Sequence, residues 1–278
     1  METVNYPEPV AKLLTYGEPE TEYYKDWPNY LEETGIGPEH IPDLLRMIDD
    51  KGLRTQDPDE DDPKYWGPVH AWRALGQLKD AAAVQPLLDR ITDLLDYDTG
   101  LGEWALEELP DVFGLIGKEA IPPLTQYLAD TSHDGEARVN VGTALEKMAE
   151  IHPETREECI KVLTQQLETM EPEAYELNAF LILNLVNLQV KEALPLIEKM
   201  FAEDRVDESI INLDNVLIKF GLKEPPPVPR FEFPGRPVAT PSEKYFTGYT
   251  SSTKSNVKTA KKAKQKQAKA SRKKNRRK

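Results

Sequence analysis

Cysteine is almost absent from this sequence, and so are the short motifs of several enzyme classes. The only cysteine, Cys159, cannot form an internal disulfide, and without a Cys-x-x-Cys pair there is no usual zinc or redox motif. No Gly-x-Gly-x-x-Gly or P-loop phrase is present to hold a phosphate, and no Gly-x-Ser-x-Gly phrase presents a nucleophilic serine. Cys159 follows the pattern of an apolar helix face, where a free cysteine is usually a small buried hydrophobe.

Long hydrophobic runs are also missing. The most apolar stretch, Ala179–Val190, is shorter than the ~20 residues of a membrane-spanning helix and contains two asparagines. The first residues, METVNYPEPV, lack the basic region and apolar segment of a secretory signal. We therefore expect a cytoplasmic protein without a membrane span.

Histidine is scarce, and the acidic residues do not form a recognisable metal motif. The acidic run Asp57–Asp62 lacks the glycine and the spaced ligands of a calcium loop. We interpret this run as a solvated loop, with a cation site as the alternative. The sequence thus predicts no metal and no cofactor.

A repeat is the clearest pattern that is present. Five similar phrases start 43, 37, 39 and 34 residues apart, and four of them carry a proline where the first turn of a helix tolerates it. The phrases are HIPDLL from His40, AVQPLL from Ala83, AIPPLT from Ala120, CIKVLT from Cys159 and ALPLIE from Ala193.

A second phrase stands before four of these five. Its apolar residues recur three and four positions apart, which is typical of an amphipathic helix and not of a strand. The phrases align on Leu75, Phe113, Leu145 and Leu185. The sequence therefore predicts an all-α fold made of helix pairs that must stack to bury their apolar faces.

This wording, above all VHAWRALGQLKDAAAVQPLLDRI, resembles the HEAT-like repeats named after phycobilisome lyases. The resemblance covers roughly residues 37–222 and implies an α-solenoid of about five helix pairs. It also implies an alternative function, that of a bilin lyase or light-harvesting assembly factor, in which Arg73, Arg138 and Asp111 are conceivable participants. The N-terminal phrases resemble those of uncharacterised bacterial HEAT-repeat proteins, which implies no activity.

Another class of HEAT-like proteins, the deoxyhypusine hydroxylases, binds two irons through His-Glu dipeptides. None of the four histidines here is followed by glutamate, so the resemblance does not extend to that site. The histidines are His40, His70, His133 and His152.

The chain around the repeats divides into three further segments. Residues 1–36 contain aromatic residues among prolines and glycines, and we interpret them as a cap over the open end of the solenoid. Residues 223–253 are a proline-rich arm or linker that cannot continue the helices. Residues 254–278 form a basic tail that we expect to be disordered on its own.

Charge is divided unevenly between the tail and the rest of the chain. The tail has 13 basic and no acidic residues, whereas residues 1–253 hold 22 basic and 49 acidic residues, a formal charge of −27. A long run of one sign attracts polyanions by counterion release, so we expect RNA or DNA contact through the tail. The alternatives are a merely solvated tail or one that binds the acidic solenoid. The candidate residues are Lys261, Lys262, Lys264, Lys266, Lys269, Arg272, Lys273, Lys274, Arg276, Arg277 and Lys278.

Two sets of residues within the repeats have both a structural and a functional interpretation. The aromatic residues Trp66, Trp72, Trp104 and Tyr127 either line a binding groove or fill space between helices. Polar residues at equivalent positions form two rows that either serve a ligand or join neighbouring helices by hydrogen bonds, and we favour the second. The rows are His70, Glu108 and Asn140, and Arg73, Asp111 and Thr143.

These observations favour a non-catalytic scaffold or adaptor that binds a protein partner on the concave face of the solenoid, while the tail tethers the complex to a polyanion. We expect the second helix of each repeat to line that face. Its polar residues, our candidates for partner contact, are Gln85, Asp89, Gln126, Gln165 and Gln166.

Overall fold

The computed structural model describes residues 5–226, apart from 22, 54–61, 98–99, 170 and 172. The chain divides into two compact units, Met1–Pro225 and Pro226–Lys278, and nearly all described residues belong to the first. In this described part the regular elements are α-helices and short 3-10 helices, with no strand, so the all-α prediction is confirmed there. The basic tail, most of the proline-rich arm and residues 57–61 of the acidic run lie outside the described residues.

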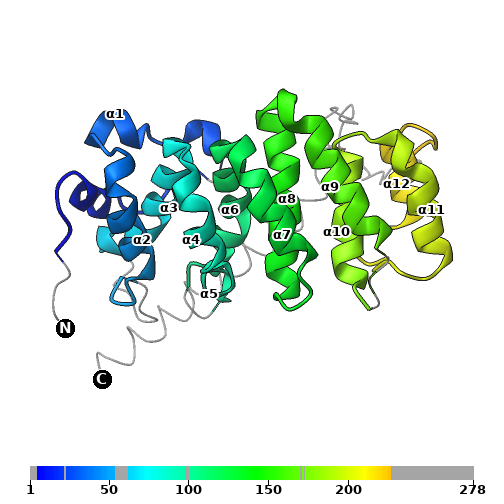
Figure 1. The fold of residues 1–278 in the computed structure, drawn as a ribbon, viewed down its shortest axis with the longest axis horizontal. Coiled ribbons are helices and arrows are strands. Elements are labelled where there is room, and N and C mark those ends of the chain that lie inside the picture. The colour runs from blue at the N-terminus through cyan, green and yellow to red at the C-terminus, as the bar shows by residue number, and fades with distance from the viewer. Residues whose placement is uncertain are drawn as a thin grey trace, which may run out of the picture. The chain divides into compact units, whose positions relative to one another are not determined.

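The helices stack side by side along the long axis, from α2 at one end to α11 and α12 at the other (Figure 1). We call two sets of them layer A and layer B. In layer A, α3 packs on α6, α6 on α8, and α8 on α10. Layer A contains α3 (Gly67–Leu78), α6 (Gly102–Ile116), α8 (Gly135–Ile151), α10 (Tyr175–Asn187) and α12 (Leu213–Lys219).

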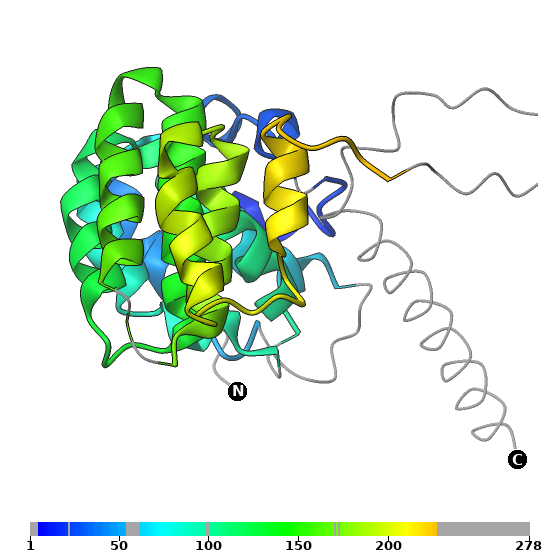
Figure 2. The same cartoon turned by 90° about the vertical axis from the view of Figure 1, so that its right-hand side faces the viewer.

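Layer B covers one side of layer A. Helix α2 packs on α3, α7 on α8, and α9 on both α8 and α10, while α11 and α12 form the last pair, seen side by side in Figure 2. Layer B contains α2 (Ile41–Asp49), α4 (Val84–Leu88), α7 (Ile121–Ala129), α9 (Arg156–Glu168) and α11 (Leu194–Ala202). Two short helices complete the α-helices, α1 (Tyr30–Thr34) against α3 and α5 (Ile91–Leu95) against α6.

Proline marks the start of layer B helices, as the repeat predicts. Pro42, Pro122 and Pro195 are each the second residue of their helix, where a missing backbone N–H breaks no hydrogen bond. The second repeat differs, because its helix α4 ends at Leu88 and a separate helix, α5, follows it.

The positions that align the repeats are the centre of the core. Leu75, Phe113, Leu145 and Leu185 each have a relative exposure of 0% and come from four successive helices of layer A. Of the aromatic residues, Trp72 is fully buried, and the buried ring of Trp66 is in edge contact with the half-buried ring of Trp104, at 5.5 Å between centroids. A continuous apolar core therefore runs through the array.

Gly76 lets α3 and α6 approach each other. A Cβ atom at this position would lie 3.1 Å from the Cα of Val112, a backbone atom that cannot rotate away. We predict that Gly76→Ala lowers the free energy of unfolding by about 1–3 kcal/mol, because overpacking forces backbone shifts. Urea unfolding followed by circular dichroism measures this change.

Gly135→Ala is the matched control for that substitution. Gly135 is also a helical glycine, the first residue of α8, and a Cβ atom there has no neighbour within 4 Å. We expect a neutral or slightly stabilising effect, since alanine has the higher helix propensity. Equal losses in the two variants would contradict the close approach at Gly76.

Candidate functional site

The N-terminal segment, residues 5–29 without residue 22, lies against layer A. Its 3-10 helix η1 (Val10–Thr15) contacts α3, and so does the following helix α1. Gln77 of α3 binds the backbone where the N-terminal segment joins α1. Its amide nitrogen donates to Pro28 O at 2.8 Å, and its Oε1 accepts from Tyr30 N at 3.0 Å. Helix α3 thus holds the end of this segment through its backbone groups.

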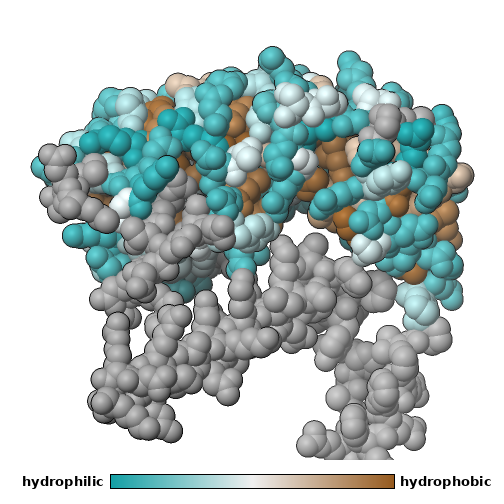
Figure 3. All heavy atoms as spheres, turned by 90° about the horizontal axis from the view of Figure 1, so that it is seen from below, coloured by the Kyte–Doolittle hydropathy of each residue, from teal (hydrophilic) through white to brown (hydrophobic). Residues whose placement is uncertain are grey.

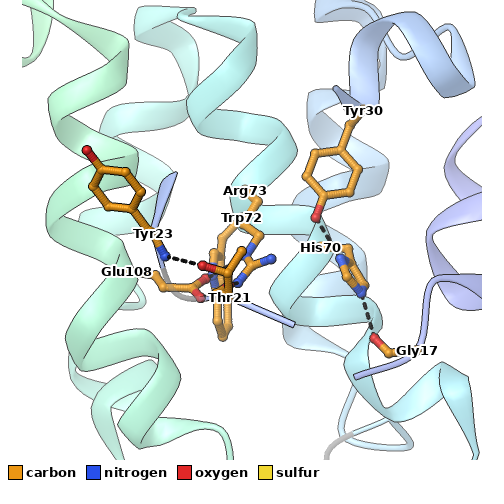
Figure 4. Close-up of polar contacts among 8 residues, drawn as sticks. All are labelled: Gly17, Thr21, Tyr23, Tyr30, His70, Trp72, Arg73 and Glu108. Atoms are coloured by element: carbon orange, nitrogen blue, oxygen red, sulfur yellow. Dashed lines mark hydrogen bonds and ion pairs between the residues drawn. The ribbon is translucent and has the colours of Figure 1, made fainter. Parts of the chain in front are cut away.

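His70 extends this attachment (Figure 4). Its Nε2 lies 2.8 Å from Gly17 O, and its Nδ1 lies 2.7 Å from the Tyr30 hydroxyl. A carbonyl can only accept, so Nε2 carries the hydrogen and Nδ1 accepts from the Tyr30 hydroxyl. Burial lowers the pKa of His70 to about 4 against the opposing effect of the Gly17 carbonyl, so the ring is neutral at physiological pH.

Arg73 and Glu108 form a buried ion pair between α3 and α6. Arg73 Nε donates to Glu108 Oε2 at 2.9 Å, and the side chains are 1% and 0% exposed. Trp72 Nε1 donates to the same carboxylate at 2.8 Å, while Arg73 also donates to Thr21 O at 2.6 Å (Figure 4). Burial alone would lower the pKa of Arg73, but the hydrogen bond and charge of Glu108 outweigh burial and raise it.

The two predicted polar rows are thus joined to each other at Arg73 and Glu108. These residues connect adjacent helices and the N-terminal segment, which agrees with the structural interpretation of the rows. Thr143, in contrast, donates within its own helix, to Val139 O at 3.2 Å.

Asn140 satisfies a backbone carbonyl that a proline leaves without its helical donor. Pro110 lies inside α6 and has no N–H to donate to the carbonyl of Leu106, four residues earlier. Asn140 Nδ2 from α8 donates to that carbonyl instead, at 2.9 Å. The side-chain Oδ1 of Asn140 and the Oδ1 of Asp111 are both buried and have no hydrogen-bond partner among the described residues.

A second polar group joins α8, α10 and α12, and the sequence analysis missed it. Asn187 Nδ2 donates to Glu146 Oε1 at 3.1 Å, and Lys219 Nζ donates to Asn187 Oδ1 at 3.2 Å. Burial raises the pKa of Glu146 to about 7, although Lys147 opposes the shift. The signal was present in the alignment, since Glu146 occupies the position of Gly76 and Gly114 at a contact between helices.

The predicted partner contacts all come from layer B. Gln85 and Asp89 belong to α4 and its C-terminal end, Gln126 to α7, and Gln165 and Gln166 to α9. Four of them are exposed, whereas Gln166 is buried. Gln85 Nε2 donates to Asp89 Oδ1 at 2.8 Å, so these two residues form one polar site on the surface.

The two arginines that a bilin lyase would use are committed to internal contacts, whereas Asp111 is not so committed within the described part of the chain. Arg73 binds Glu108, and Arg138 binds Glu171 with two nitrogens, at 2.9 and 2.6 Å. Burial raises the pKa of Cys159 to about 11, so this side chain is a thiol at neutral pH. Within the described ranges no three His, Cys, Asp or Glu side chains are grouped to bind a metal.

The comparison with family models matches residues 37–225 to a family described as "Protein of unknown function (DUF1186)". The chain belongs to the DUF1186 family. No curated protein and no solved structure matches it. The matched DUF1186 region extends from α2 to α12, so the network in Figure 4 ties residues before that region, Gly17, Thr21 and Tyr30, to residues inside it. No helix in the described part is both long and apolar enough to cross a membrane.

Proposed function

We propose that this protein is a cytoplasmic, non-catalytic scaffold of the HEAT-like α-solenoid type that binds a partner protein. The observation that supports this proposal best is the N-terminal segment, whose non-helical stretch layer A holds through the carbonyls of Gly17 and Thr21. Arrays of stacked helix pairs bind extended chains on such long surfaces. A partner segment would use the same physical contacts on another part of the array.

The charge of the chain supports a basic partner and a separate role for the tail. Residues 1–253 have a formal charge of −27, which favours a partner with basic groups and repels nucleic acid. Residues 254–278 have a formal charge of +13, and we propose that they tether the complex to a polyanion such as RNA. Figure 3 agrees with a surface suited to polar recognition, since hydrophilic residues cover most of the visible described surface.

Layer B is one candidate surface for the partner. Its exposed polar residues recur on successive helices, as expected of a surface that reads an extended or helical segment. They are Gln85, Asp89, Gln126 and Gln165.

Partner capture from a lysate of the source cells tests this proposal. The full chain is compared with a full-length variant in which the 11 candidate tail residues, Lys261 to Lys278 as named above, are replaced by glutamine. Each is washed at low and high salt, with and without nuclease. We expect the same protein to remain on both forms after nuclease and high salt, and nucleic acid to remain only on the unaltered chain at low salt.

The opposite result would reject the scaffold. If everything captured requires the basic residues and is lost with salt or nuclease, the acidic helices select no partner. The protein would then bind a polyanion, and the tail would be the part of the chain that binds it.

A further inference from the structure

The N-terminal segment shows which groups layer A offers to the backbone of a bound chain. On α3 these groups are hydrogen-bond donors, the His70 Nε2–H, the Arg73 guanidinium and the Gln77 amide. They meet backbone carbonyls of the segment, those of Gly17, Thr21 and Pro28. A chain of carbonyl acceptors is thus matched by a row of donors.

One repeat further, the same positions carry acceptors. Asp111 of α6 is equivalent to Arg73 of α3, and Asn140 of α8 is equivalent to Glu108 of α6. Asp111 and Asn140 are 8% and 2% exposed, and within the described ranges the Oδ1 atom of each has no hydrogen-bond partner. A buried acceptor without a donor costs free energy and calls for an explanation.

The charges around Asp111 select the kind of donor that would complete the site. Glu108 and Glu150 add negative charge near Asp111, and Lys147, the cation that lowers its pKa, donates to Glu150 at 3.3 Å. Burial is the main reason that the pKa of Asp111 is raised to about 6, and a cation placed beside the carboxylate would reverse that effect. A protonated amine or guanidinium fits these acceptors better than a neutral donor.

We propose that the α6–α8 face of layer A is a docking surface for an extended segment of the partner, and that a lysine or arginine side chain of this segment binds Asp111 and Asn140. The site continues the surface that the N-terminal segment occupies on α3. This inference rests on the proposed scaffold function and adds the face and the chemistry of the partner.

The test uses fluorescence anisotropy with the full-length protein and a library of fluorescein-labelled, C-terminally amidated hexapeptides. One position is fixed in turn as arginine, lysine, citrulline, glutamine or glutamate. The proteins compared are the wild type, Asp111→Asn, and Glu119→Gln as a charge-matched control at an exposed residue of the 3-10 helix Lys118–Ala120, just before α7. We expect arginine or lysine to bind about tenfold or more tightly than citrulline or glutamine at one position, because a charge-assisted hydrogen bond replaces a neutral one.

Asp111→Asn should abolish this preference, and Glu119→Gln should keep it. Thermal unfolding of all three proteins at pH 8 confirms that they are folded. The absence of a cation preference, or its survival in Asp111→Asn, would overturn the inference, while capture of the same lysate protein would leave the scaffold function standing. Loss of all capture would reject the scaffold itself.

The chain's own basic residues are the competing occupant, and limited trypsin digestion detects them. Faster cleavage after the lysines and arginines of 254–278 in Asp111→Asn than in Glu119→Gln would show that the tail occupies the site. That result would overturn docking by a partner. Equal cleavage rates support it.

Discussion

Replacing Glu108 with alanine is expected to lower the free energy of unfolding by about 3–5 kcal/mol, because it leaves the buried Arg73 guanidinium without a counter-charge. Arg73 is 1% exposed, so water cannot replace the lost carboxylate. Trp72 Nε1 loses its acceptor at the same time. Urea unfolding followed by far-UV circular dichroism measures the loss.

An exposed ion pair provides the matched control. Arg90 Nε donates to Asp49 Oδ1 at 2.8 Å, but both side chains are substantially exposed, so Asp49→Ala should cost less than about 1 kcal/mol. A double variant, Arg73→Met with Glu108→Leu, removes both buried charges and should be more stable than Glu108→Ala. Equal losses in Glu108→Ala and Asp49→Ala would contradict the buried ion pair.

Glu108→Ala should also loosen the N-terminal segment more than the rest of the protein. Arg73 donates to Thr21 O, and its guanidinium lies 4.8 Å from the ring centre of Trp27. Both contacts depend on the orientation that Glu108 gives to the guanidinium. Hydrogen exchange should therefore increase in residues 5–29 more than in α9, which packs on α8 and α10.

Sequence reasoning predicted the helices and their register because these depend on a periodic pattern. Leu75 and its three equivalents are all fully buried, as an aligned stripe requires. The contacts of the N-terminal segment, which we interpreted only as a cap, could not be predicted in this way, since the segment has no period and is held by single contacts such as that between Gly17 and His70. The arrangement of helices as a HEAT-like solenoid stays part of the proposal.

The candidate site was found only in part for a similar reason. The alignment placed Arg73 and Glu108 in separate rows, and their pairing depends on how far α3 and α6 are offset along their axes. Asn140 could have been assigned from Pro110, because a proline inside a helix frees one carbonyl for a neighbouring helix to bind. Glu146 is one of 49 acidic residues, and its charge alone does not distinguish it from an acid on the surface.

Glutamine at position 146 is expected to stabilise the protein at pH 8 and to have little effect at pH 5. Glu146 is 5% exposed, and burial raises its pKa from 4.5 in the unfolded chain to about 7 in the fold. The folded state therefore binds more protons than the unfolded state between these values. The contribution of protonated Glu146 to stability is therefore fully present below pH 4.5 and is lost as the pH rises through 7.

The size of the effect follows from the width of that interval. One pKa unit corresponds to about 1.4 kcal/mol, so the buried charge lowers stability at pH 8 by up to about 3 kcal/mol. Glutamine resembles the protonated carboxyl in shape and charge and can still accept a hydrogen bond from Asn187 Nδ2. Glu146→Gln should thus recover about 1–3 kcal/mol at pH 8, measured by urea unfolding at both pH values.

Comparison at each pH separates Glu146 from His70, which acts in the opposite direction. The pKa of His70 falls from 6.5 to about 4 on folding, so its contribution is present above pH 6.5 and is lost as the pH falls towards 4. This contribution is the same in the variant and the wild type and cancels in their difference. Glu154→Gln, at a highly exposed residue, should leave stability unchanged at both pH values. A difference between Glu146→Gln and wild type that does not change with pH would mean that Glu146 is ionised in the fold throughout this range, with Asn187 and Lys219 stabilising its charge.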